Sequence, residues 1–129
     1  RDAQESRGLG DVYKRQVAPP TFYTTAQGTE IKASEIDLLG RMMSMQKAHP
    51  SYAMTGAMCT AAAAAIPGTL VHSILSPCGK LPEIRIGHGS GTLVCGVETE
   101  KGQSIPFIKE TYGYRTARLL MKGVAPISY

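Results

Sequence analysis

Two glycine-containing elements of this 129-residue sequence have the composition of an anion-binding site. The first is Thr55-Gly56-Ala57, which opens a run of small, uncharged residues that ends before Pro67-Gly68. If this run is a helix, its first backbone N–H groups have no intrahelical acceptor and lie at the positive end of the helix dipole, so they can bind a carboxylate or a phosphate. The alternative is that Thr55 is only an N-cap residue and that Gly56 only allows close packing.

The second element is Gly87-His88-Gly89-Ser90-Gly91, which lies between two segments with the pattern of strands. Its backbone N–H groups and the Ser90 hydroxyl could also face an anion, although the residues by themselves favour a flexible hairpin turn. Arg115 and Arg118 could pair with an anionic substrate, but a solvated basic face is the commoner explanation of such residues.

The metal-ligating residue types do not form a site in the sequence. His49, His72 and His88 are not spaced as ligands on one element, so no metal is expected. The three cysteines are an odd number without a CxxC pair, and we expect reduced thiols with Cys59 and Cys95 in the core.

Hydrophobic spacing predicts two helices that would position these residues. Ile36, Leu39, Met42 and Met43 follow a helical spacing, which predicts a first helix over 35–47 that His49-Pro50 ends. The run MCTAAAAAI predicts a second helix. Because it carries no charge on any face, we expect it to be surrounded by closely approaching backbone in the middle of the fold.

The remaining segments alternate or are rich in β-branched residues. They predict an extended entry over 17–31, strands over 69–75, 83–88, 92–98 and 105–112, a helical turn over 116–121 and a last strand over 124–128. The fold class is therefore expected to be α+β, with a curved mixed β-sheet, a half-barrel, wrapped around the buried small-residue helix.

Length and composition restrict the class of protein. The length allows one domain, and 43% hydrophobic with 19% charged residues is ordinary for a globular protein. The net charge of +4 comes from scattered basic residues with few aromatic neighbours, so nucleic acid is not an expected partner. No apolar run is long enough to span a membrane and no signal peptide is recognisable, which predicts a cytoplasmic protein without membrane contact.

Residues 1–16 differ from the rest in being charged, Gly-rich and without periodicity, so we expect a disordered tail without core contacts. Asp11 to Gln16 can be back-translated to a sequence that resembles a transposon-end adapter of sequencing libraries. This predicts that 1–16 are non-native and that the native part of the chain is 17–129.

Four segments in order resemble the methylaconitate isomerase family known as PrpF. They are Val17-Ala18-Pro19-Pro20, the segment 41–66, the segment 84–91 and Tyr114-Arg115-Thr116-Ala117-Arg118. The resemblance implies a diaminopimelate epimerase-like fold of two halves, with this chain as most of the second half. It also implies cofactor-independent isomerisation of unsaturated di- or tricarboxylates, of the methylaconitate, methylitaconate or oxalomesaconate type, by proton transfer beside a carboxylate.

The resemblance also assigns roles to residues. The substrate-binding residues that it implies are Thr55, Gly56, Ala57, His88, Ser90 and Gly91. No catalytic residue is expected here, because the family's proton-transferring lysine and cysteine lie in an N-terminal domain that this chain lacks, and Ala53 stands where related epimerases have a catalytic cysteine. The expected partners are a small polycarboxylate and that missing domain, and a homodimer is left open. The alternative is a non-catalytic small-anion-binding module.

Overall fold

The computed structural model describes residues 13–44, 47–75, 82–100 and 105–124. Within them the chain forms a six-stranded sheet in the order β1-β4-β6-β7-β8, with β5 paired to β4. Its strands are β1 (Tyr13–Ala18), β4 (Leu38–Ser44), β5 (Lys47–Ala48), β6 (Glu83–His88), β7 (Gly91–Glu100) and β8 (Phe107–Gly113). The β4–β6 pair is parallel and the others are antiparallel, so the sheet is mixed.

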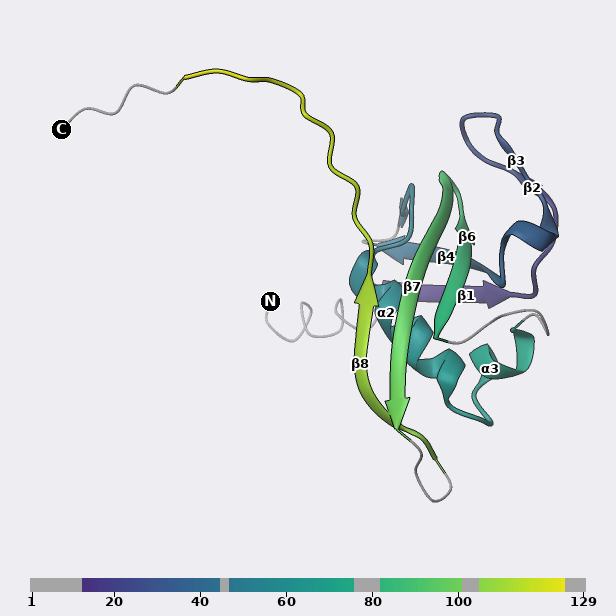
Figure 1. The fold of residues 1–129 in the computed structure, drawn as a ribbon. Helices are drawn as coiled ribbons and strands as arrows, with labels where there is room; N and C mark the ends of the chain where they lie inside the picture. Colours follow the sequence, from purple (N-terminus) through teal and green to yellow (C-terminus); the bar gives the residue numbers. More distant parts are fainter. Residues whose placement is uncertain (1–12, 45–46, 76–81, 101–104, 125–129) are drawn as a thin grey trace, which may run out of the picture.

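The helix α2 (Met54–Ala65) lies against this curved sheet, and the short helix α3 (Leu70–Ile74) packs near its C-terminal end (Figure 1). Ala57, Ala61 and Ala64 are 0% exposed, so their methyl groups form the buried stripe of α2. Because these side chains are small, the helix can approach the backbone of the sheet closely, and Ile84, Ile86, Cys95 and Val97 complete the core. The expected α+β fold, with a curved mixed sheet around a small-residue helix, is confirmed.

The opposite face of α2 is open, which corrects one expectation. Thr55 and Cys59 are exposed, whereas the uncharged sequence predicted burial on all sides. The sheet curls around one side of the helix only, and small uncharged residues are equally compatible with an uncovered face. The prediction that Cys59 lies in the core is wrong, the same prediction for Cys95 is confirmed, and Cys78 lies outside the described residues.

The predicted helix over 35–47 is wrong. A 3-10 helix, η1 (Ala33–Glu35), precedes strand β4. The burial of Leu38, Gly40 and Met42 alternates with exposure, as in a strand. Because β4 pairs with β1 on one edge and β6 on the other, two ladders of backbone hydrogen bonds outweigh the helix propensity of its methionines.

The predicted strand over 69–75 is also wrong, since it contains helix α3. Gly68 turns the chain with a φ of 85°, and the Thr69 hydroxyl then accepts a hydrogen bond from the His72 N–H, which starts the helix. Residues 116–121 are extended and form no helical turn. The strands over 83–88, 92–98 and 105–112 are confirmed as β6, β7 and β8, whereas 125–128 of the expected last strand lie outside the described residues.

The extended entry over 17–31 is confirmed. After β1 it contains a small hairpin of β2 (Tyr23–Thr24) and β3 (Glu30–Ile31), which pair antiparallel around the turn at Gly28. The tail expected over 1–16 is wrong at 13–16, because these residues are part of β1 and pair with β4. An uncovered edge of β4 offers N–H and C=O groups that an extended segment can pair with whatever its periodicity. Residues 1–12 lie outside the described part.

An ion pair between the buried Asp37 and the partly exposed Arg85 joins the start of β4 to β6. Asp37 is 1% exposed, and its carboxylate accepts hydrogen bonds from the Arg85 N–H at 2.7 Å and from the Arg85 guanidinium at 2.8 and 3.1 Å. The Asp37 N–H donates in return to the Arg85 carbonyl. Since removing one partner of such a pair leaves a buried charge uncompensated, this contact fixes where β6, and the turn that follows it, begin.

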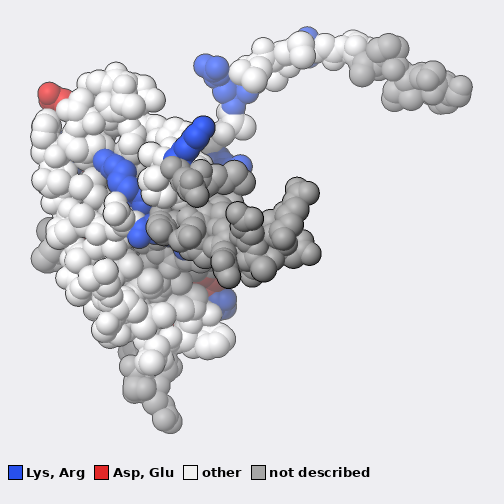
Figure 2. Space-filling view, turned by 180° about the vertical axis from the view of Figure 1, so that it is seen from behind, with Lys and Arg blue, Asp and Glu red and all other residues white. Residues whose placement is uncertain are grey.

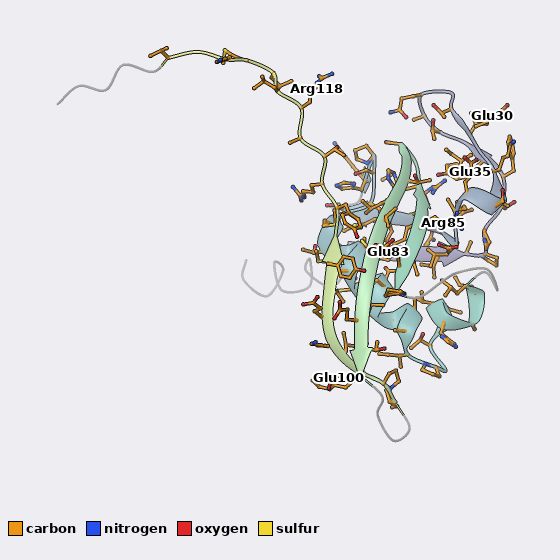
Figure 3. The ribbon with its side chains drawn as sticks, viewed as in Figure 1. Glu30, Glu35, Glu83, Arg85, Glu100 and Arg118 are labelled. Atoms are coloured by element: carbon orange, nitrogen blue, oxygen red, sulfur yellow. The ribbon has the colours of Figure 1, made fainter. Side chains whose placement is uncertain are left out.

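After β8 the chain leaves the sheet as an extended arm (Figure 1). Arg118 lies on this arm, far from the sheet (Figure 3). Leu119, Leu120 and Met121 are each at least 80% exposed, so the arm makes little contact with the body of the described structure.

Candidate functional site

The N-terminal end of α2 has no side-chain cap. Its N-cap residue is Ala53, and the first bond of the helix runs from the Ala57 N–H to the Ala53 carbonyl at 2.9 Å. Thr55 is therefore not the N-cap, which corrects the alternative reading of the sequence. Because an α-helix supplies no acceptor for its first N–H groups, those of Met54, Thr55 and Gly56 lack one within α2, whereas that of Ala57 is used.

An open pocket of about 380 Å³ lies at this end of the helix. Its lining residues are His49, Ser51, Tyr52, Ala53, Met54, Thr55 and Arg115. The lining contains one permanent cation and no acidic side chain, and the helix dipole adds partial positive charge. On the face shown in Figure 2, basic atoms cover more of the described surface than acidic atoms do. The pocket is therefore suited to an anion.

The loop 49–53 forms one wall of this pocket and is anchored at both ends. The His49 N–H donates to the Met42 carbonyl at 2.8 Å, which ties the loop to β4. The Tyr52 ring is 3% exposed, and its hydroxyl lies 3.0 Å from the Thr60 hydroxyl of α2. A side chain at Gly40 would place its Cβ 2.8 Å from the Tyr52 ring, so this glycine is needed for the close approach.

The turn between β6 and β7 contacts the middle of the same loop. The Ser90 hydroxyl donates a hydrogen bond to the Pro50 carbonyl. The Ser90 N–H donates to Nδ1 of His88 at 3.2 Å. The N–H and the hydroxyl of Ser90 are thus bound by the protein, and Ser90 lies beside the pocket without lining it.

The carbonyl groups of this turn are bound from the opposite side. The Gly87 carbonyl accepts from Arg41 at 3.3 Å, the Gly89 carbonyl from the Ala26 N–H at 2.9 Å, and the Gly91 carbonyl from the Tyr23 hydroxyl at 2.6 Å. The Arg41 guanidinium also lies over the Tyr23 ring, 5.2 Å from its centre. The turn is therefore held between the β2–β3 hairpin and the pocket loop, unlike the flexible hairpin turn that its residues favoured.

His88 is kept neutral in this environment. Burial lowers its pKa, and the nearby charges of Arg41 and His49 lower it further, while a hydrogen bond with the Thr92 backbone opposes them. His88 is 7% exposed. A neutral ring leaves Nδ1 free to accept the Ser90 N–H, so the protonation state and the hydrogen bond agree.

The structure brings together part of the expected site. Of the six residues implied by the resemblance, Thr55 lines the pocket and Ser90 contacts its loop through Pro50. Gly56 is buried, and a side chain there would place its Cβ 2.9 Å from Nε of Arg15, so Arg15 occupies the space that the glycine leaves. Gly56, Ala57, His88 and Gly91 are not among the lining residues.

Sequence reasoning missed the loop residues of the pocket. It considered His49 only as the end of a helix and as a rejected metal ligand, and it did not consider Ser51 or Tyr52. The available signal was their position, since the loop directly before an uncapped helix must pass its N-terminal end. Arg115 lines the pocket, as one of the two readings of that arginine required, whereas Arg118 lies on the arm.

In the described part of the chain, no three His, Cys, Asp or Glu side chains are grouped so that they could hold a metal ion. Among the residues that the structure describes, no helix has the length and apolar character to cross a membrane.

Comparisons with known proteins place this geometry in a family. The sequence model of the PrpF protein family matches residues 11–128. The chain is 38% identical over 107 residues to a 2-methyl-aconitate isomerase of Shewanella oneidensis and 39% identical over 124 residues to one of Cupriavidus necator. A 3-methylitaconate isomerase of Eubacterium barkeri is 34% identical over 105 residues. These matches cover 83%, 91% and 81% of this chain.

The chain therefore belongs to the PrpF family. The crystal structure of a methylitaconate-delta-isomerase superimposes with a TM-score of 0.68 and 28% identity over 87% of this chain, so the expected diaminopimelate epimerase-like fold is confirmed. The chain spans 27%, 31% and 27% of the lengths of the three relatives and 30% of the solved structure.

Proposed function

We propose that this chain is the C-terminal domain of an isomerase of unsaturated di- or tricarboxylates, and that its part is to bind a substrate carboxylate in the pocket at the start of α2. The observation that carries the proposal is the uncapped helix end that opens into a pocket lined by Arg115 and by no acidic side chain. Membership of a family whose named relatives are methylaconitate and methylitaconate isomerases supports the same substrate class.

The chemistry of such an isomerisation explains why carboxylate binding matters. Removing a proton from the carbon beside a carboxylate shifts negative charge onto the carboxylate oxygens. Backbone N–H groups and a guanidinium that already face those oxygens stabilise this charge without reorganising, which lowers the barrier. The N–H groups of Met54 and Thr55, with Arg115, would do this here, in a reaction that needs no cofactor.

The acid and the base belong, in this proposal, to a domain outside the chain. Ala53 precedes Thr55 closely and carries no group that transfers protons, and Cys59 faces the uncovered side of α2. The chain alone is expected to be inactive, and it would act as a cytoplasmic protein together with that domain. Hydrogen–deuterium exchange into 3-methylitaconate by the purified chain would contradict this division of labour.

Binding is tested by titrating the ¹⁵N-labelled chain with itaconate, a small unsaturated dicarboxylate. We expect saturable shifts of the Met54, Thr55 and Gly56 amides and of the Arg115 side chain. The dimethyl ester of itaconate has the same shape without charge and should cause no such shifts. If itaconate shifts only amides remote from this pocket, or none, the proposed site is wrong.

The alternative of a non-catalytic anion-binding module predicts the same shifts. It differs in the complete protein, where the enzyme requires a lysine and a cysteine in the upstream domain and isomerises methylaconitate. A complete protein that binds the substrate but never exchanges its protons would favour the binding module.

A further inference from the structure

The pocket depends on a loop that has no regular secondary structure of its own. Between β5 and α2, residues 49–53 form neither helix nor strand. Such a segment keeps one conformation only where its polar groups are bound. Its two ends are fixed by the bond of His49 to Met42 and by the buried Tyr52 ring. Inside the loop, the Ser51 N–H donates to Nδ1 of His49 at 3.2 Å. The carbonyl of Pro50, which lies between these two residues, is bound by a contact from outside the loop.

The contact on the Pro50 carbonyl comes from the β6–β7 turn. Pro50 has no N–H group, so its carbonyl is the only backbone group through which it can be held. The Ser90 hydroxyl donates to this carbonyl, and a Cβ at Gly89 would lie 3.2 Å from the same oxygen. The turn thus approaches Pro50 so closely that a side chain at position 89 would crowd the Pro50 carbonyl, and the residue before Ser90 is a glycine.

The turn is itself held by hydrogen bonds from β4 and from the β2–β3 hairpin. The carbonyl groups of Gly87, Gly89 and Gly91 are bound by Arg41, Ala26 and Tyr23 respectively. Pro50 is therefore bonded through Ser90 to a turn that the β2–β3 hairpin and β4 hold in place. The path runs entirely through bonds between described residues, and none of them uses an atom that must also face a ligand.

We infer that Ser90 is a positioning residue: it fixes the loop 49–53 through the Pro50 carbonyl, and the Tyr23 hydroxyl fixes Ser90 by holding the Gly91 carbonyl. Ser90 then shapes the carboxylate pocket without touching the carboxylate. The inference rests on the proposed function, because it concerns how that same pocket keeps its form.

The test combines amide hydrogen exchange, measured by NMR on the whole chain, with itaconate titration. Ser90→Ala should speed exchange at the amides of Ser51 to Gly56 and weaken itaconate binding. Both effects should be about fivefold, the factor that corresponds to a neutral hydrogen bond of about 1 kcal/mol. Ser90→Thr keeps the hydroxyl and should restore both. Exchange in β6 should stay unchanged.

Two further variants make the comparison specific. Tyr23→Phe removes the hydroxyl that holds Gly91 and should act in the same direction as Ser90→Ala, with a smaller effect. Ser73→Ala makes the same chemical change as Ser90→Ala, but it removes a hydroxyl that donates to the Leu70 carbonyl at 2.8 Å in helix α3. It should change neither readout, because α3 contributes no residue to the pocket or to the turn.

Distinct results would overturn the inference. Weaker itaconate binding by Ser90→Ala with unchanged exchange at 51–56 would show that Ser90 touches the ligand. Unchanged exchange and unchanged binding would show that the Pro50 bond holds nothing. If the wild-type chain does not bind itaconate, the proposed function is wrong, and the exchange measurements alone still decide whether Ser90 fixes the loop.

Discussion

The two ends of α2 are built in opposite ways. At the C-terminal end, the Thr69 hydroxyl lies 2.6 Å from the Ala63 carbonyl and 3.0 Å from that of Ile66, and the His72 ring lies 2.8 Å from the Ala64 carbonyl. At the N-terminal end, the side chain of the N-cap residue Ala53 offers no acceptor, and Thr55 is exposed.

If the proposed function is correct, this difference separates stability from ligand binding within one helix. Both ends of a helix leave backbone groups without intrahelical partners, and an end that serves stability alone is closed by side chains. The closed end of α2 follows that rule. In the proposed function, the open end gives up the stability of a cap and leaves N–H groups beside a pocket, where they can bind an anion.

The largest expected effect is on ligand binding at the open end. Thr55→Asp places a carboxylate in the first turn of α2, on a residue that lines the pocket. It should weaken itaconate binding by about 2 kcal/mol, roughly thirtyfold, because two like charges would lie within a few ångströms. The same charge should raise the melting temperature slightly, since it complements the helix dipole.

Thr55→Asn is the matched control, because it has nearly the shape of aspartate without the charge. It should leave the affinity within about threefold of the wild type. Equal losses in the two variants would mean that shape, and not charge, matters at Thr55. A rise in itaconate affinity on Thr55→Asp would show that the itaconate carboxylate does not bind at this end of α2.

The second effect is on stability at the closed end. Thr69→Val removes a hydroxyl that contacts the Ala63 and Ile66 carbonyls and accepts from the His72 N–H. The free energy of unfolding in urea should fall by about 1.5 kcal/mol, because these groups lose their partner. Thr55→Val makes the same chemical change at the open end and should alter stability by less than about 0.5 kcal/mol. Comparable losses at the two ends would remove the distinction between them.

The sequence predicted where α2 ends but not what closes that end, because the segment 69–75, which carries Thr69 and His72, was expected to be a strand. Small residues followed by Pro67-Gly68 fixed the limits of the helix from local chemistry alone. The identity of β4 could not be predicted from local spacing. Leu39, Met42 and Met43 fit a helix by their spacing, but they form a strand because β4 pairs with β1 and β6.

The candidate site shows the same limit. Thr55 was identified as a candidate because the start of an uncharged helix is recognisable in the sequence. Ser90 was identified because a Gly-rich turn is recognisable as well. That Ser90 binds Pro50 depends on two segments 40 residues apart, and no periodicity encodes such a contact. The same holds for Arg15, which fills the space beside Gly56 from a segment that sequence reasoning assigned to a disordered tail.

The smallest expected effect concerns pH, and it arises at the open end. The folded protein lowers the pKa of His88 below its ordinary value of 6.5, chiefly through burial and then through Arg41 and His49. Between the folded pKa and 6.5 the unfolded chain therefore binds more protons than the folded one, so stability increases with pH in this range. The contribution is fully present above pH 6.5 and is lost as the pH falls toward the folded pKa of His88.

His88→Asn removes the titrating group and should flatten this dependence. We expect the melting temperature of the wild type to fall more than that of the variant between pH 7.5 and pH 5.5, and the difference between the two slopes isolates His88 from other titrating groups. Protonating His88 also removes the acceptor of the Ser90 N–H. Amide exchange at Ser90 should therefore rise in the wild type as the pH is lowered, after correction for the intrinsic pH dependence of exchange. Parallel melting curves for the two proteins would show that the burial of His88 does not contribute to the pH response of this end of the molecule.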